Sequence, residues 1–190
     1  MPGAGERVPL SASAASRDGL SVAGALAMRI FTMPLKVGDK APVFSLPAST
    51  GKTISLQELA GKKVVLYFYP RDDTPGCTKE ACGFRDTHEG LTAAGVEVLG
   101  VSADSLRVHA KFAEKYRLSF PLLSDAEKIV ATAYGAWGEK QVRGRTVIGM
   151  KRMTFLIDEG GTIQQIWSTV KPEVHATEVL EAIRRGGATS

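Results

Sequence analysis

The segment that most constrains the fold is an apolar strand followed at once by a helix that begins beside a cysteine. The run Val64–Tyr69 is apolar, β-branched and aromatic, which predicts a buried strand, and Pro70 ends it. Thr74 suits the N-cap position of a helix, and Pro75 suits its first turn, where a missing N–H removes no hydrogen bond. We therefore expect Cys77 in the first turn of this helix, beside unpaired backbone N–H groups.

A thiol at a helix N-terminus differs chemically from a thiol in a hydrophobic core. The thiolate is the nucleophile, and the positive end of a helix dipole lowers the pKa of a cysteine from its ordinary value of about 8.5. Arg71 and Lys79 lie close to Cys77 in the sequence, although the sequence does not give the direction of their side chains. We therefore predict that Cys77 is a reactive cysteine. The alternative is a small buried residue that only fills space.

Cys82 is the only other cysteine, and its spacing from Cys77 limits what the two can do together. Five residues of α-helix advance about 7.5 Å and turn about 500°, so the two sulfurs face different sides. A disulfide requires Cα atoms within about 7 Å and converging Cβ atoms. If the two cysteines pair, the first turns must unwind, and Gly83 would favour this. On spacing alone, the alternative is two independent thiols, with Cys82 buried on the helix face.

The residues around Cys77 also form a family pattern. Pro70, Thr74 and Cys77 match the order Pro, three residues, Thr or Ser, two residues, Cys, which resembles the active site of the peroxiredoxins. The run Thr-Pro-Gly-Cys-Thr-Lys-Glu-Ala-Cys is similar to the bacterioferritin comigratory, or Q-type, subgroup. Further matches extend from about Leu35 to Ile183 and include residues 38–44, 135–140 and 152–158.

This resemblance implies a thiol peroxidase that reduces hydrogen peroxide and organic hydroperoxides to water and alcohols in antioxidant defence. It implies that Cys77 attacks the peroxide and becomes a sulfenic acid, which Cys82 converts to an intramolecular disulfide. Thioredoxin or a similar dithiol would then reduce this disulfide. The resemblance implies no cofactor and no metal, and it suggests a monomer.

The resemblance also implies a role for the residues around the sulfur. The backbone N–H groups of Gly76 and Cys77 and the Thr74 hydroxyl would donate to the peroxide. Arg152 would keep Cys77 ionised and polarise the oxygens, and Pro70 would shield the sulfenic acid from solvent. The residues by themselves support plainer interpretations, in which Thr74 is a helix cap and Pro70 ends a strand. By itself Arg152 would be a solvated charge, and only the family pattern reverses that interpretation.

From Met33 onward, strands and helices alternate. A β-hairpin is expected over residues 43–56, with a short helical turn at 57–60 before the strand that leads to Cys77. The later expected elements are strands at 96–102, 120–123, 153–157 and 162–167, and helices at 105–116, 128–134 and 172–185. This order predicts an α/β fold with a central mixed sheet covered on both faces, which matches the thioredoxin fold that the resemblance implies.

Composition limits the number of domains, the kind of partner and the cellular compartment. The chain of 190 residues, 44% of them hydrophobic, suits one core, and we expect a thioredoxin-like domain at residues 33–190. The net charge of +4 is too small and too dispersed to indicate a nucleic-acid partner. Two cysteines do not make a disulfide scaffold, so a reducing compartment, the cytoplasm, is expected.

Residues 1–32 are rich in Ser, Ala and Gly and are expected to form a disordered extension. Their apolar run, Leu20–Met28, is too short to span a bilayer, so no membrane partner is expected. The alternative is a signal or transit segment, because Arg17 precedes the run and Ala-Gly-Ala resembles a cleavage site.

Several polar residues are expected to have no chemical role. His88, His109 and His175 fall on three different helices without metal-ligand spacing, and we expect them to be solvated or partly packed. Lys79 and Glu80 are expected to keep their helix soluble. On the helix at 105–116, one face is expected to carry Val108, Phe112 and Tyr116 inward. Trp137 is expected to anchor a packed loop, and the alternative that the resemblance implies is a place in the substrate wall.

Two other functions remain open from the sequence. The first is a thiol–disulfide oxidoreductase on the same fold, although such proteins usually carry Cys-x-x-Cys, and thioredoxins place a cis-proline where Met153 stands here. The second is a redox sensor or binding module without turnover, which would use the same two cysteines. Peroxide consumption driven by thioredoxin separates both alternatives from a peroxidase.

Overall fold

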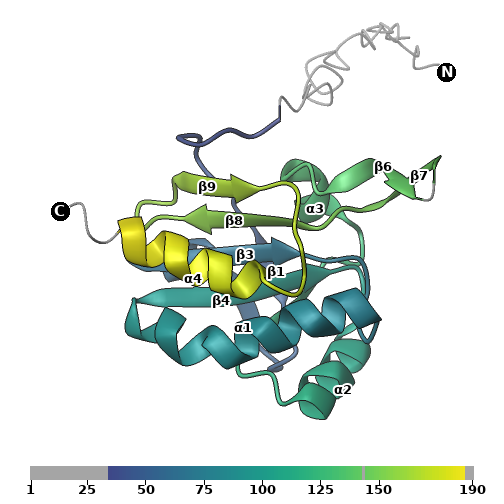
Figure 1. Ribbon diagram of the computed structural model, residues 1–190, viewed down its shortest axis with the longest axis horizontal. Coiled ribbons are helices and arrows are strands. Elements are labelled where there is room, and N and C mark those ends of the chain that lie inside the picture. Colours follow the sequence, from purple (N-terminus) through teal and green to yellow (C-terminus); the bar gives the residue numbers. More distant parts are fainter. Residues whose placement is uncertain (1–33, 143, 187–190) are drawn as a thin grey trace, which may run out of the picture. The chain divides into compact units, whose positions relative to one another are not determined.

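A five-stranded mixed sheet forms the centre of the computed structural model, which describes residues 34–142 and 144–186 (Figure 1). In spatial order the strands are β5 (Leu122–Ser124), β4 (Val96–Ser102), β3 (Lys63–Phe68), β8 (Met153–Ile157) and β9 (Ile163–Trp167). The pairs β3–β4 and β4–β5 are parallel, whereas β3–β8 and β8–β9 are antiparallel. The expected mixed sheet is confirmed, whereas the expectations for residues 1–32 lie outside the described residues.

The central strand β3 is buried on both faces, which explains its continuous apolar run. Val65 and Tyr67 pack into one core with residues of α1 (Pro75–Ala93) and α4 (His175–Gly186), which lie side by side across the sheet (Figure 1), and with Phe112 of α2 (Leu106–Tyr116). Val64 and Leu66 pack into the second core with residues of α3 (Ile129–Ala133). Successive strand residues alternate between faces, and burying each large apolar side chain contributes roughly 1.5–3 kcal/mol.

Two hairpins accompany the sheet. The expected N-terminal hairpin is confirmed as β1 (Ser45–Pro47) and β2 (Thr53–Ser55), followed by the short helix η3 (Gln57–Leu59). The second hairpin, β6 (Trp137–Val142) with β7 (Arg145–Met150), was not expected, and Trp137 begins a strand instead of anchoring a loop. Most of its residues are exposed or only partly buried, so the sequence carries no alternation of buried and exposed positions that would predict a strand.

Helix and strand boundaries differ from expectation mainly at their starts. β4 and β8 coincide with the expected strands, but β5 begins at Leu122 rather than at residue 120, and α4 at His175 rather than at residue 172. The predicted inward face of α2 is wrong in one position. Val108 is 37% exposed, and His109 is fully buried beside Phe112. His109 and Phe112 are three residues apart, which places them on one face of the helix. A histidine is not an apolar residue, so the hydrophobic pattern did not mark this position as buried.

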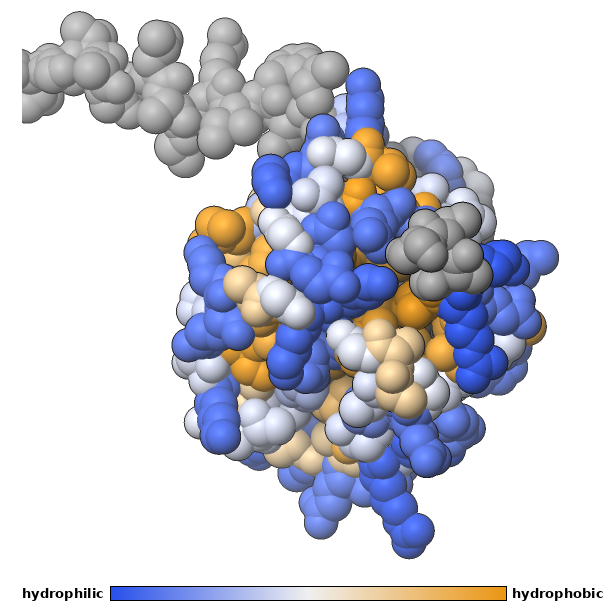
Figure 2. All heavy atoms as spheres, turned by 90° about the vertical axis from the view of Figure 1, so that its left-hand side faces the viewer, coloured by the Kyte–Doolittle hydropathy of each residue, from blue (hydrophilic) through white to orange (hydrophobic). Residues whose placement is uncertain are grey.

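The surface carries both polar and apolar side chains. Figure 2 shows one face on which hydrophilic side chains surround smaller hydrophobic areas. The most exposed large apolar side chains include Val43 and Ile129. Single exposed apolar residues of this kind are normal on a folded domain. Across residues 34–142 and 144–186, no helix has both the length and the apolar character needed to cross a membrane.

Candidate active site

The loop between β3 and α1 delivers Cys77 to the first turn of α1. Thr74 has the extended backbone of an N-cap residue (φ −97°, ψ 151°), and α1 begins at Pro75, as expected. Cys77 is 2% exposed. The Thr74 side chain, however, does not cap the helix, because its hydroxyl donates to the Arg71 carbonyl oxygen at 3.0 Å. The N–H groups of the first turn therefore have no side-chain cap from Thr74.

Arg152 contacts the Cys77 sulfur. Its Nη2 lies 3.3 Å from Cys77 Sγ, and its Nη1 donates to Oε2 of Glu80. A Cβ atom at Gly76 would lie 3.3 Å from Arg152 Nη2, so the absence of a side chain at Gly76 leaves room for this approach. Burial alone would lower the pKa of Arg152, but the neighbouring Glu80 and Cys77 raise it above its ordinary value. The structure thus places Arg152 as a charged group against the sulfur rather than in solvent.

Glu80 is fully buried on the same side of α1 as Cys77. The expectation that it keeps the helix soluble is therefore wrong. Burial raises the pKa of the Glu80 carboxyl to about 7, against the opposing effect of Arg152. Its second oxygen, Oε1, has no hydrogen-bond partner among the described residues. Glu80 follows Cys77 by three residues, so both side chains lie on one helix face. This spacing was the sequence signal that Glu80 lies on the same side of the helix as the reactive sulfur.

Cys82 lies half-buried further along α1, and both cysteines are free thiols. Because α1 is continuous from Pro75 to Ala93, the helix geometry that excludes a Cys77–Cys82 bond applies to this state. Gly83 lies against α4, where a Cβ atom at this position would come within 3.2 Å of the Ala176 Cβ. Gly83 therefore allows close packing of α1 on α4, in addition to the helix weakness expected from its sequence.

Three other residues near Cys77 in the sequence are exposed at the surface. Lys79 forms an exposed ion pair with Glu173 at 3.0 Å. Arg71 and Pro70 are exposed, and the shielding role of Pro70 stays a prediction.

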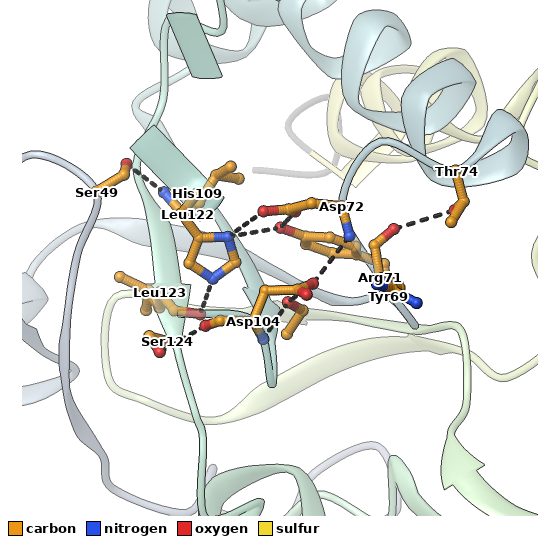
Figure 3. A network of polar contacts seen from close by, with 11 residues as sticks. Ser49, Tyr69, Arg71, Asp72, Thr74, Asp104, His109, Leu122, Leu123 and Ser124 are labelled. Atoms are coloured by element: carbon orange, nitrogen blue, oxygen red, sulfur yellow. Dashed lines mark hydrogen bonds and ion pairs between the residues drawn. The ribbon is translucent and has the colours of Figure 1, made fainter. Parts of the chain in front are cut away.

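Two histidines contradict the expectation of solvated or partly packed residues. His109 and His175 are both fully buried. Nε2 of His175 lies 2.7 Å from the Thr154 hydroxyl, and burial lowers the pKa of His175 to about 4, so its ring is neutral at neutral pH. His109 belongs to a polar network that includes Asp72 in the loop before Cys77 (Figure 3). Within the residues that the structure describes, no group of three or more His, Cys, Asp or Glu side chains could hold a metal ion.

Known proteins share most of this chain. Residues 37–166 match the AhpC/TSA family. The peroxiredoxin Bcp of Escherichia coli K12 is 45% identical over 151 residues, which cover 80% of this chain and 97% of that protein. A Coxiella burnetii protein assigned to the bcp peroxiredoxins is 53% identical over 148 residues, covering 78% of this chain and 98% of its own.

Solved structures agree with these relatives. A Cys-to-Ser variant of PrxQ from Xylella fastidiosa matches with a TM-score of 0.77 at 33% identity, covering 82% of this chain and 99% of its own. The bacterioferritin comigratory protein of Xanthomonas campestris, studied for its alkyl peroxide reduction activity, matches with a TM-score of 0.71 at 38% identity, covering 75% and 91%. The similarity extends far beyond the Cys77 segment, so the expected thioredoxin fold is confirmed.

Proposed function

We propose, from the premise that this chain belongs to the AhpC/TSA family and is a peroxiredoxin of the bcp group, that it reduces hydrogen peroxide and small organic hydroperoxides with the Cys77 thiolate. The observation that carries this proposal is the 3.3 Å contact between Arg152 Nη2 and Cys77 Sγ at the start of α1. A guanidinium in this position favours the thiolate, which is the nucleophilic form of cysteine.

The same groups can stabilise the reaction. The Cys77 thiolate attacks one peroxide oxygen, the O–O bond breaks, and the other oxygen leaves as hydroxide or alkoxide, which takes a proton from solvent. Arg152 and the backbone N–H groups of Gly76 and Cys77 face the negative charge that spreads over the oxygens. Glu80 accepts a hydrogen bond from Nη1 of Arg152 and so holds the guanidinium in place. Nη2 of Arg152 can then contact both the sulfur and the peroxide oxygen. The product on Cys77 is a sulfenic acid.

Cys82 is the proposed resolving residue. Its thiol condenses with the Cys77 sulfenic acid, a disulfide forms and water leaves. Because an intact α1 keeps the two sulfurs apart, its first turns must unwind before this step. We propose a dithiol protein of the thioredoxin type as the reductant that restores both thiols by exchange. We further propose that the protein acts as a monomer in the cytoplasm, where reduced thiols are maintained.

Steady-state peroxide consumption tests the proposal. With thioredoxin, thioredoxin reductase and NADPH present, the protein should consume hydrogen peroxide over many cycles, and Cys77→Ser should abolish this consumption. Full activity in Cys77→Ser would contradict the proposal. A redox sensor would consume about one equivalent per reduction cycle without turnover, and a disulfide reductase would reduce protein disulfides and leave peroxide untouched.

A further inference from the structure

The loop that carries Asp72 is bound to α2 through a buried pair of polar side chains (Figure 3). Asp72 is 5% exposed and His109 is fully buried. Oδ2 of Asp72 lies 2.7 Å from Nδ1 of His109, and Oδ1 accepts a hydrogen bond from the Tyr69 hydroxyl at 2.6 Å. Asp72 therefore connects the end of β3, the loop and α2 at one carboxyl group.

The protons of this pair can be counted from its partners. Nε2 of His109 lies 3.2 Å from the carbonyl oxygen of Leu123, and a carbonyl oxygen only accepts, so Nε2 carries a proton and donates it. A hydrogen bond between Nδ1 and the Asp72 carboxyl group at 2.7 Å requires one further proton between them. Whichever of the two atoms holds this proton, the pair has no net charge and every buried polar atom in it has a partner. The pair therefore adds no net charge beside the loop.

The backbone at Asp72 is fixed as well. Its N–H donates to Oδ2 of Asp104 at 2.9 Å, and the same oxygen accepts a hydrogen bond from the Ser102 hydroxyl at the end of β4. The Asp104 carbonyl oxygen in turn accepts from the Ser124 hydroxyl in β5 at 2.6 Å. Both the side chain and the backbone of Asp72 are thus tied to the edge of the sheet where the parallel strands end.

The neighbouring residue, Asp73, is tied to the same helix from outside. Its backbone is in the left-handed region (φ 55°), which is uncommon for a residue other than glycine. Its carboxylate accepts hydrogen bonds from Lys115 Nζ at 2.7 Å and from the Tyr116 hydroxyl at 2.6 Å. Two consecutive loop residues therefore form hydrogen bonds with α2, Asp72 in the core and Asp73 at the surface.

This loop leads directly into the candidate active site. Residues 70–74 contain Pro70 and end at Thr74, the N-cap of α1. The position of this loop therefore determines where the first-turn N–H groups and Cys77 lie. Resting on the proposed function, we propose that Asp72 and His109 are positioning residues for peroxide reduction. They hold this loop so that the donors around Cys77 are aligned with the peroxide oxygens. They do not create the thiolate, because Arg152 supplies the charge at the sulfur.

Substitutions at Asp72 separate this role from a general contribution to folding. In Asp72→Ala, the Tyr69 hydroxyl, already 3.4 Å from His109 Nδ1, can donate to that nitrogen, so no buried group is stranded. Asp72→Asn keeps an acceptor for Tyr69 and gains a donor for a neutral His109, so it preserves the tie. Tyr134→Phe serves as the matched control, because it removes a buried hydroxyl that bonds the Pro42 carbonyl in the other core.

The measurement is the ratio of two rate constants for Cys77, determined with Cys82→Ser as the parent so that only one cysteine reacts. One is for oxidation by hydrogen peroxide, and the other is for alkylation by iodoacetamide, which needs a thiolate but no aligned donors. Because misplacement by about 1 Å can cost roughly 100-fold in rate, Asp72→Ala should lower the peroxide rate at least ~10-fold. The alkylation rate should stay within about twofold of the parent, because the thiolate is unchanged.

The remaining variants decide the outcome. Asp72→Asn should restore the peroxide rate to within about threefold of the parent, and Tyr134→Phe should leave the ratio unchanged even though it lowers stability. His109→Leu removes the partner of Asp72 on α2. It should lower the ratio of the peroxide rate to the alkylation rate, as Asp72→Ala does. Equal changes in both rates for Asp72→Ala, or none, would overturn the positioning role while leaving the peroxidase intact. A parent protein that does not react with peroxide would overturn the proposed function itself, and the positioning role with it.

Discussion

The two segments on either side of Thr74 are held in different ways. Before it, Asp72 is anchored by buried hydrogen bonds to β3, β4 and α2. After it, the first turns of α1 are held by the exposed ion pair between Lys79 and Glu173 and by the contact of the buried Glu80 with Arg152, and Gly83 packs against Ala176 of α4. Removing one partner of a buried hydrogen bond costs about 1–3 kcal/mol when the other partner is left unsatisfied, whereas exposed ion pairs contribute little because water screens them.

This difference matches what the two reaction steps need. Peroxide reduction requires donors that do not move, and the anchored loop keeps the start of α1 in place. Disulfide formation requires that Cys77 and Cys82 approach each other, which an intact helix forbids. In the proposed mechanism the site therefore combines a fixed support with a helix end that opens, and Thr74 marks the boundary between them.

The largest expected effect is at Cys82, the proposed resolving cysteine. Cys82→Ser should consume one equivalent of peroxide and then lose turnover with thioredoxin, because no disulfide can form for the reductant to attack. Intact-mass spectrometry after peroxide should show an added oxygen in Cys82→Ser and the loss of two hydrogen atoms in the wild type. Undiminished turnover in the variant would mean that α1 has no need to open.

The next effect concerns the cation at the sulfur. Arg152→Lys keeps the charge but loses the planar fork that reaches Cys77 and Glu80 together, so the peroxide rate constant should fall about 100-fold. The same change at the exposed Arg145 of β7 should leave the rate unaltered and serves as control. Stopped-flow measurement of single-turnover oxidation gives both values. Equal rates in Arg152→Lys and the wild type would contradict the role of the bidentate contact.

A smaller effect is expected from Glu80, and it depends on pH. Its folded-state pKa is about 7, above the ordinary 4.5, so the folded protein binds the proton more tightly and loses stability as pH rises through this window. Glu80→Gln lacks this titration. Between about pH 5 and about pH 8, the unfolding free energy of the wild type should fall relative to Glu80→Gln on the order of 2 kcal/mol.

Urea unfolding at several pH values measures this difference. Parallel pH profiles of the two proteins would show that burial does not govern the carboxyl group. A wild type that gains stability relative to Glu80→Gln with rising pH would show that Arg152 outweighs burial, and the first turns of α1 would then be held more firmly than the comparison with Asp72 implies.

The smallest effect is expected at the surface. Lys79→Met removes the exposed ion pair with Glu173, and disulfide formation after one equivalent of peroxide should change by less than ~3-fold. Lys62→Met is the matched control, because it removes another exposed ion pair, the one between Lys62 and Glu97. A large acceleration specific to Lys79→Met would mean that this contact, rather than helix geometry, keeps α1 closed.

Local sequence signals were sufficient for much of the fold. The cap residue and the proline before Cys77 predicted the start of α1, and continuous apolar runs predicted β3, β4 and β8. The hairpin β6–β7 was missed because its residues are largely exposed and give no periodic signal. Local patterns describe elements well when one or both faces are buried, and poorly otherwise.

The polar partners in the site could not be predicted locally. Arg152 and Glu80 are 72 residues apart, and Asp72 and His109 are 37 residues apart, so each residue by itself resembles an ordinary surface charge. Buried polar residues leave no hydrophobic period, and their burial becomes visible only when the partner is in place. The family pattern identified Arg152, but neither the pattern nor the spacing identified His109.

Hydrogen–deuterium exchange on the reduced and the disulfide forms tests the contrast between the two segments most directly. Amides of residues 78–82 should lose most of their protection in the disulfide form, whereas the Asp72 amide and the amides of α2 around His109 should keep theirs. If α1 stayed protected in a protein whose mass shows the disulfide, or if the Asp72 amide opened together with it, the account of a fixed loop beside an opening helix would be contradicted.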